Sequence, residues 1–253
     1  MSTINIAILG DIHCGLNTVH EVVEYLRSTS IDAIILVGDY ACSSMDTMQS
    51  LETIVKIFEV LSKASDRIFI VWGDSDIELF HKLTHLYGYS RKRVLELLKY
   101  LNNMDSIIDL SSGEKYEIDR GIYITSNREL VDRKTIYVVH TDINIATNSL
   151  LHVEGHRHYG QIRIPYINAG YVYIDSIDRK GMYWVVEVSR RGIERIDIHI
   201  LSSDIHEYRC PIHKDEGVFY IMRNDICPVC KDVLNARFTD DAYLATESLF
   251  KSM

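Results

Sequence analysis

The chain has 253 residues, of which 47% are hydrophobic and 25% charged, and this composition excludes a disordered chain, a collagen-like repeat and a disulfide-rich miniprotein. With 27 basic and 36 acidic side chains, the formal charge of −9 argues against non-specific nucleic-acid binding, because that binding depends on basic residues. No apolar run approaches the roughly 18 residues of a membrane span.

The first third of the chain predicts alternating strands and helices. Apolar runs typical of buried strands occur at 4–9, 33–37 and 67–72, and helical spacing of apolar residues occurs at 18–27 and 51–61. This order is a βαβαβ unit, which implies a parallel sheet with right-handed crossovers. Each strand ends in Gly or Gly-Asp at the carboxyl edge, where open α/β sheets bind ligands.

The rest of the chain changes from helical to β-rich. Residues 78–103 have helical spacing and predict either a cap or a flanking helix. Short β-rich runs then follow at 115–118, 121–125, 135–140, 161–168, 171–174, 182–188 and 193–200. A parallel unit followed by mostly antiparallel strands indicates two sheets packed face to face.

Carboxylate and imidazole side chains gather at the predicted strand ends. In chain order the segments are Asp11-Ile12-His13, Gly38-Asp39, Gly73-Asp74-Ser75-Asp76, His140 and Gly155-His156-Arg157-His158. These are the ligand types that hard and borderline divalent metals prefer. Asp39 lies between the others, and we expect it to bridge two ions about 3.5–4 Å apart, as in two-metal hydrolytic sites.

This ordered set resembles the calcineurin-like metallophosphoesterase family, whose pattern is D-x-H, G-D, G-N-H-[DE], a lone H and G-H-x-H. The resemblance covers about residues 4–175, and four of the five motifs match as they stand. Asn168-Ala169-Gly170 occupies the place where the family often has Asn-Pro-Gly. The fold class expected is α/β, a four-layer αββα sandwich of two mixed sheets over residues 1–200, with 77–104 as a helical cap.

The resemblance also implies two sets of metal ligands. The first ion would be held by Asp11, His13, Asp39 and His158, and the second by Asp39, Asp74, His140 and His156. A water or hydroxide between the ions would attack phosphorus, and the residues expected to act in catalysis are Asp39, Asp74, His140 and Arg157. Mn²⁺ is the favoured ion, with Ni²⁺, Fe²⁺ or Zn²⁺ as alternatives, because mixed Asp/His sites discriminate poorly among first-row metals.

The third motif departs from the family pattern at two positions. Asp74 replaces Asn, and the added negative charge should weaken binding of a doubly charged monoester more than that of a singly charged diester. Ser75 replaces the His credited with protonating the leaving oxygen, and a serine hydroxyl is not an acid at neutral pH. His81 and His85 on the predicted cap helix are either substitutes for that His or exposed helix residues.

These departures favour a phosphodiesterase acting on phosphodiester or cyclic-nucleotide-type substrates, with a nucleotide-like small molecule as the expected partner. Two alternatives stay open. One is a pyrophosphate-bond hydrolase of the same fold. The other is a non-catalytic scaffold, since the retromer subunit with this fold is similar in its third motif.

A second cluster of metal-ligand residues lies near the C-terminus. Cys210-Pro211-Ile212-His213 and Cys227-Pro228-Val229-Cys230 form two knuckles at zinc-site spacing. The pattern resembles a zinc ribbon and predicts one structural Zn²⁺ held by Cys210, His213, Cys227 and Cys230. We expect this ribbon at 205–235, followed by a helix or tail at 236–253. Three alternatives are open for its role: a structural cap, a homodimer contact or a protein-docking site.

The odd number of cysteines, five, and a first segment unlike a secretory signal predict a reducing, cytoplasmic location. Cys14 and Cys42 are then expected to be buried thiols or to flank the metals. Arg157 is the expected contact for a substrate phosphate, in preference to the basic run 91–93. Tyr40, directly after Asp39, is the tyrosine expected to line a nucleotide pocket.

Overall fold

The computed structural model describes residues 3–119, 121–142, 144–146, 148–213, 218–223 and 226–231. The helix or tail predicted at 236–253 lies outside these residues. The α-helices are α1 (Leu16–Ser28), α2 (Thr47–Leu61), α3 (Asp74–Thr84) and α4 (Gly88–Asn102). None of the helices in the described part of the chain has both the length and the apolarity that a bilayer crossing requires.

One large sheet has six strands in the order β14-β13-β1-β2-β3-β4. Its strands are β1 (Ile4–Leu9), β2 (Ala33–Leu36), β3 (Ile68–Ile70), β4 (Ile107–Asp109), β13 (Met182–Ser189) and β14 (Gly192–Ile200). Strands β1 to β4 are parallel, whereas β13 runs antiparallel to both β1 and β14. The predicted parallel βαβαβ unit is therefore present.

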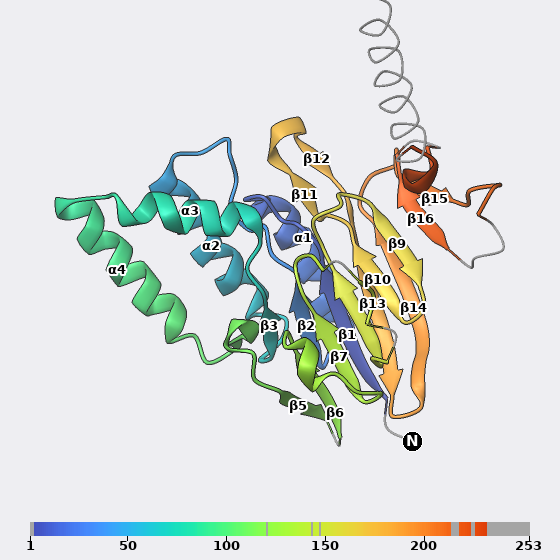
Figure 1. The fold of residues 1–253 in the computed structure, drawn as a ribbon. Helices are drawn as coiled ribbons and strands as arrows, with labels where there is room; N and C mark the ends of the chain where they lie inside the picture. Colours follow the sequence, from blue (N-terminus) through green and yellow to red (C-terminus); the bar gives the residue numbers. More distant parts are fainter. Residues whose placement is uncertain are drawn as a thin grey trace, which may run out of the picture.

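The second large sheet has eight strands in the order β15-β16-β9-β10-β8-β7-β6-β5. Its strands are β5 (Tyr116–Asp119), β6 (Ile122–Thr125), β7 (Thr135–Val138), β8 (Leu151–Glu154), β9 (Gly160–Arg163), β10 (Tyr166–Ala169), β15 (His206–Tyr208) and β16 (Phe219–Met222). A separate hairpin pairs β11 (Tyr173–Ile174) with β12 (Arg179–Lys180). Figure 1 shows the two large sheets face to face, and this confirms the expected α/β class with two mixed sheets.

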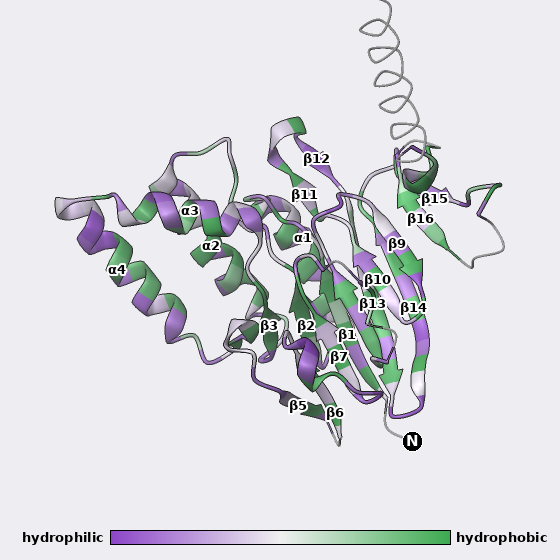
Figure 2. Ribbon diagram, in the orientation of Figure 1, coloured by the Kyte–Doolittle hydropathy of each residue, from purple (hydrophilic) through white to green (hydrophobic). Residues whose placement is uncertain are grey.

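The core has two parts, one on each face of the six-stranded sheet. Between the sheets, Ile8 and Trp184 pack in one cluster with Val153 and Ile167 from the eight-stranded sheet. Figure 2 shows the hydrophobic character of these central strands. On the other face, all four α-helices contribute buried apolar side chains to a second cluster. In α1 these residues follow the spacing of a one-sided amphipathic helix: Val19, Val22, Val23 and Leu26.

The outer face of the eight-stranded sheet is covered differently. Tyr137 points outward from β7 and packs against Val131 and Ala146 of the adjoining loops. Among the described residues, this outer layer consists of loop segments and the short 3-10 helix η2 (Arg128–Leu130), while α1 to α4 belong to the other layer.

Two predicted segments are divided in the structure. The helical segment 78–103 forms α3 and α4, because the chain turns at Gly88, whose φ of +61° is readily adopted only by glycine. The β-rich run 161–168 forms the antiparallel strands β9 and β10, which are joined at Ile164-Pro165. Proline has no backbone N–H to donate to a strand ladder, so a single strand through Pro165 is disfavoured.

The C-terminal cysteine-containing segment is continuous with the main fold. Strand β16 pairs with β9, and β15 pairs with β16, so both strands extend the eight-stranded sheet at the edge seen beside β9 in Figure 1. The strands next to these cysteines therefore belong to the eight-stranded sheet, the same sheet whose strand β8 is followed by Gly155-His156-Arg157-His158.

Candidate metal centre

The strand-end loops are held together by backbone hydrogen bonds. The N–H groups of Ile12 and His13 both donate to the Asp39 carbonyl at 2.9 Å, and Val172 N–H donates to the Asp11 carbonyl at 2.8 Å. The backbone is also strained here, because His13, Asp39, His156 and His158 have φ values of 38°, 55°, 68° and 52°. Positive φ in residues other than glycine costs free energy, and its clustering is typical of functional sites.

Four of the predicted ligands form a first cluster. Ligand atoms of Asp11, His13, Asp39 and His158 all lie within 4.8 Å of one another. His158 Nε2 is 3.2 Å from Asp11 Oδ2 and 3.4 Å from His13 Nε2. The hydrogen bond with the Asp11 carboxylate raises the pKa of His158.

A second cluster shares Asp39 with the first. Ligand atoms of Asp39, His140 and His156 lie within 4.8 Å of one another, and His140 Nε2 is 3.5 Å from Asp39 Oδ2. Asp74 is at the rim of this cluster: its Oδ2 is 3.2 Å from His156 Nδ1, and its side chain is largely exposed. The structure thus places a carboxylate between two groups of ligands, where the sequence predicts the bridge.

Two of the histidine rings, one partly buried and one buried, are oriented by backbone carbonyls. His13 Nδ1 lies 3.0 Å from the Ala41 carbonyl, and His140 Nδ1 lies 2.7 Å from the Val37 carbonyl. A carbonyl only accepts, so each Nδ1 carries the proton and each Nε2 presents its lone pair to the clusters. Metal-binding histidines are commonly fixed in this way.

Ser75 orients the shared carboxylate, a role that the sequence did not indicate. Its backbone N–H and its hydroxyl donate to Asp39 Oδ1 at 2.9 and 2.8 Å. Asp39 Oδ2 is therefore the oxygen left to face both clusters. The only sequence signal is the position of Ser75 at the start of α3, directly after Gly73-Asp74.

Asp76 fixes the two loops that carry Asp39 and Asp74. Its fully buried carboxylate accepts hydrogen bonds from the N–H groups of Tyr40, Ala41 and Gly73 at 2.8–2.9 Å. Burial raises the pKa of Asp76 to about 7. Because its carboxylate accepts hydrogen bonds from both loops, Asp76 fixes their positions relative to each other.

Replacing Asp76 by Ala should lower the free energy of unfolding by about 3 kcal/mol, because three backbone donors lose their buried acceptor. Asp76→Asn keeps one oxygen acceptor in the same shape and should cost less than half as much. Urea unfolding of both variants checks this prediction. If both variants lost the same free energy of unfolding, the side-chain oxygen that Asp76→Asn retains would not be what stabilises these loops.

The residues present fit divalent cations. Asp11 Oδ2 and His140 Nε2 are buried, and within the described ranges neither makes a hydrogen bond, although another candidate ligand lies close to each: His158 Nε2 at 3.2 Å and Asp39 Oδ2 at 3.5 Å, respectively. Leaving two buried polar atoms unpaired is costly, and buried polar atoms are nearly always satisfied. Because both atoms face the clusters, cations coordinated there would satisfy them.

A family model for calcineurin-like phosphoesterases matches residues 4–208. The chain belongs to this family. The family is one of metal-dependent hydrolases, and both ligand clusters lie within the matched residues. A search of curated proteins found no match.

Three solved structures illustrate what the chain is similar to. The structure of TT1561 from Thermus thermophilus aligns with a TM-score of 0.53 at 13% identity, covering 79% of this chain and all of that one. A structure described as a novel archaeal phosphodiesterase aligns with a TM-score of 0.43 at 17% identity, over 78% of this chain and all of that one. A metallophosphoesterase from Sphaerobacter thermophilus aligns at 0.44 and 17%, over 79% and 89%. The similarity to TT1561, at 13% identity, shows a shared fold only.

Two cysteines differ from the expectation of free thiols. Cys14 and Cys42 form a disulfide, with their Cα atoms 5.4 Å apart. The prediction was wrong because the two loops are drawn together by contacts that are distant in sequence, including a 2.8 Å hydrogen bond from Cys14 N–H to the Tyr40 carbonyl. The disulfide lies directly after His13 and close to Asp39.

The suggested pocket role of Tyr40 is also wrong. Its side chain is fully buried, its hydroxyl donates to the Val71 carbonyl at 2.7 Å, and its ring packs against Phe58 and Trp72. His81 is exposed on α3 and His85 is exposed directly after its last residue, and His81 is seven residues, or roughly 10 Å of helix, beyond Asp74. In the basic run 91–93, Arg93 forms ion pairs with Glu52 and Glu96 on the helical face.

The C-terminal ligands come together as a third cluster. Atoms of Cys210, His213, Cys227 and Cys230 lie within 4.8 Å of one another. Cys210 Sγ is 3.7 Å from Cys230 Sγ, and Cys227 Sγ is 3.4 Å from His213 Nδ1. Ligands about 2.3 Å from a tetrahedral zinc are separated by about 3.8 Å, so this spacing fits a zinc ion.

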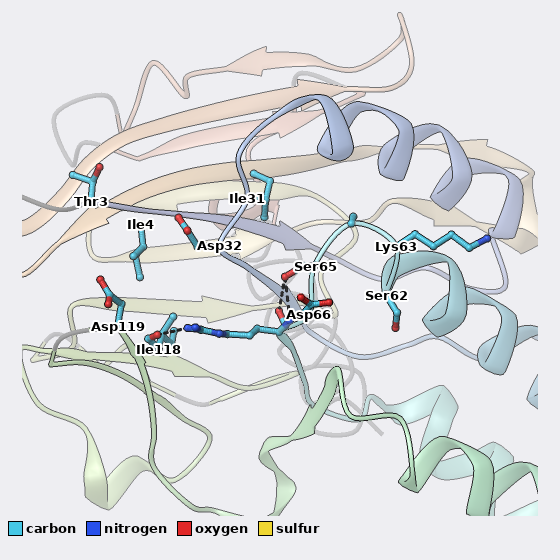
Figure 3. Close-up of a pocket in the computed structure, with 12 residues that line it drawn as sticks. Thr3, Ile4, Ile31, Asp32, Ser62, Lys63, Ser65, Asp66, Ile118 and Asp119 are labelled. Carbon is cyan, nitrogen blue, oxygen red and sulfur yellow. Dashed lines mark hydrogen bonds between the residues drawn. The ribbon is translucent and has the colours of Figure 1, made fainter.

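A large hollow elsewhere in the molecule is not part of the metal centre. It encloses about 570 Å³ and is lined by residues at the start of β1 and by those that precede β2 and β3, including Asp32 and Asp66 (Figure 3). This is the amino edge of the parallel strands, whereas the metal ligands follow their carboxyl ends. Arg67 donates to the Ile118 carbonyl across it at 2.5 Å.

Proposed function

We propose that the protein is a metal-dependent phosphodiesterase that hydrolyses its substrate at the two clusters joined by Asp39. The observation that carries this proposal is the position of Asp39 Oδ2, which faces His13 at 4.0 Å and His140 at 3.5 Å. Two bound divalent cations would stabilise charge on the phosphoryl oxygens and lower the pKa of a water molecule. Mn²⁺ is our favoured ion, since the donors are carboxylates and imidazoles.

The chain's own residues would orient and select the substrate. Asp11, His13, Asp39, His140, His156 and His158 hold the donor atoms in two adjoining groups. Arg157 is exposed between His156 and His158 in the sequence, and we assign it contact with a phosphoryl oxygen of the substrate. The hydroxyl of Ser75 donates to Asp39, and it is not an acid that would assist a poor leaving group.

The preference for diesters rests on Asp74. Its carboxylate is close to His156 at the exposed side of the second cluster, where a substrate phosphoryl group would approach. A phosphomonoester dianion is repelled there more strongly than a diester monoanion. This supports diester hydrolysis, and it makes a pyrophosphate-bond substrate a second outcome to be tested.

Asp74→Asn should raise kcat/KM for p-nitrophenyl phosphate relative to bis(p-nitrophenyl) phosphate by about tenfold. Such a change corresponds to about 1.4 kcal/mol, within the roughly 1–4 kcal/mol expected between charges 4 Å apart near a surface. Steady-state kinetics with Mn²⁺ measures the ratio. Asp105→Asn is the matched control, because Asp105 is exposed before β4, at the opposite end of the parallel strands.

An unchanged ratio in Asp74→Asn would overturn the charge argument. Wild-type hydrolysis of the monoester at the rate of the diester would overturn the proposed preference. Turnover of a nucleoside diphosphate alone would favour pyrophosphate-bond hydrolysis, and no turnover with Mn²⁺, Ni²⁺, Fe²⁺ or Zn²⁺ would favour a scaffold.

The third cluster is proposed to hold one structural Zn²⁺. Its three cysteines and one histidine match a closed site, and Cys210 and Cys227 are buried.

A further inference from the structure

A pocket joins the metal centre to the C-terminal cysteine knuckle. It encloses about 410 Å³, within the roughly 300–1,000 Å³ range of small-molecule sites. One end is formed by Arg157 and His158, and the other by Ile226, Pro228 and Lys231. A group attached to a phosphoryl centre near His158 would extend into it.

The wall nearest the metal centre is rigidly held. The ring of Tyr171 meets that of His158 edge to face, 6.3 Å apart, and Tyr171 pairs through its backbone with Asp11. Arg223 donates to the Tyr171 hydroxyl at 2.7 Å and to the Lys180 carbonyl at 2.8 Å. Since Arg223 is also paired with Asp204, it fixes the aromatic wall and is not available to a ligand.

The opposite wall is built by the second cysteine knuckle. Pro228 lies between Cys227 and Cys230, and Lys231 N–H donates to the Cys227 carbonyl at 2.9 Å. Ile226, directly before Cys227, is 54% exposed although it lines the pocket. The conformation of this wall therefore depends on the third cluster, to which Cys227 and Cys230 belong.

The lining has a definite chemical character. Buried Met182, Ile205 and Met222 give an apolar floor, and Tyr159 and Tyr171 give aromatic edges. Apart from Arg223, which is paired with Asp204, the lining carries the cations Arg157 and Lys231, and no carboxylate is among the described lining residues. In a chain of net charge −9, such a local excess of positive charge suits an anionic ligand with a flat apolar group.

We propose that this pocket binds the nucleoside group of a nucleoside phosphodiester, with its base against the apolar floor and the cysteine knuckle as one wall. The inference rests on the proposed phosphodiesterase activity and deepens it. The C-terminal metal cluster then determines specificity as well as local structure.

The test compares two diesters that release the same p-nitrophenolate. One is thymidine 5′-(p-nitrophenyl phosphate), and the other is methyl p-nitrophenyl phosphate, which has no base. With Mn²⁺, the wild type should favour the thymidine ester in kcat/KM by at least tenfold. Ile226→Glu should reduce this preference at least fivefold, mainly through KM.

Ile164→Glu is the matched control, because Ile164 is 58% exposed in the β9–β10 turn and does not line the pocket. Lys231→Ala is a second variant, in case Ile226→Glu disturbs the knuckle, and its preference should also fall. An equal preference in wild type and both pocket variants would overturn the pocket assignment while leaving the phosphodiesterase proposal intact.

If neither ester is hydrolysed with any of the four metals, the proposed function fails and the pocket is judged by binding. Calorimetric titration with the unhydrolysed thymidine 5′-(p-nitrophenyl phosphate) should then show binding to wild type and Ile164→Glu, weakened at least fivefold in Ile226→Glu. Absence of binding to the wild type would overturn the pocket assignment as well.

Discussion

Asp39→Asn should reduce kcat/KM for bis(p-nitrophenyl) phosphate by about 10³-fold or more. Ser75 donates two hydrogen bonds to Asp39 Oδ1, so an Asn side chain would keep its oxygen there and turn its NH₂ group toward the two clusters. The shared position would lose both its negative charge and its lone pairs. A loss of several kcal/mol of transition-state stabilisation corresponds to this rate change.

Mn²⁺ stoichiometry should fall together with activity in Asp39→Asn, while the melting temperature in the absence of metal should change little. Ser75→Ala is the informative companion. It removes only the hydroxyl donor, so we expect a smaller loss of about 10- to 100-fold, as is typical for groups that orient a metal ligand. Full activity in Asp39→Asn would show that this carboxylate does not join the two clusters.

Cys227→Ser should abolish binding of one zinc ion per chain and release strands β15 and β16 from the sheet. Structural zinc contributes about 10–16 kcal/mol of binding free energy in small zinc modules, far more than a three-residue and a four-residue strand supply by pairing. Amide exchange in Phe219–Met222 should accelerate at least 100-fold. Mass spectrometry measures both the zinc content and the exchange.

Val229→Ser is the matched control in the same knuckle, because Val229 is 45% exposed and supplies no ligand atom. It should keep both the zinc and the slow exchange. Slow exchange in Cys227→Ser without zinc would mean that pairing with β9 alone holds these strands, and that the metal has no structural role.

The parts of the fold that the sequence predicts well are those governed by local pattern. Apolar runs ending in Gly-Asp predict parallel strands, and parallel strands bring their carboxyl ends to one edge. Asp11 and Asp39 are therefore neighbours in space for a reason visible in the sequence. The Cys/His knuckles are predictable in the same way, because their spacing is set by the geometry of one ion.

The remaining features depend on contacts between distant segments. The Cys14–Cys42 disulfide follows from the alignment of two loops, and no local pattern indicates it. Tyr40 is next to a metal-ligand candidate, yet its ring packs into the helix-facing core. Likewise, Ser75 has its orienting role because α3 begins at Asp74 and aims its first turn at Asp39.

The central claim is that Asp39 joins two cation sites, and anomalous diffraction from crystals grown with Mn²⁺ tests it most directly. We predict two manganese peaks about 3.5–4 Å apart, on either side of Asp39 Oδ2, one near His13 and His158 and the other near His140 and His156. A single peak, or peaks away from Asp39, would contradict the account.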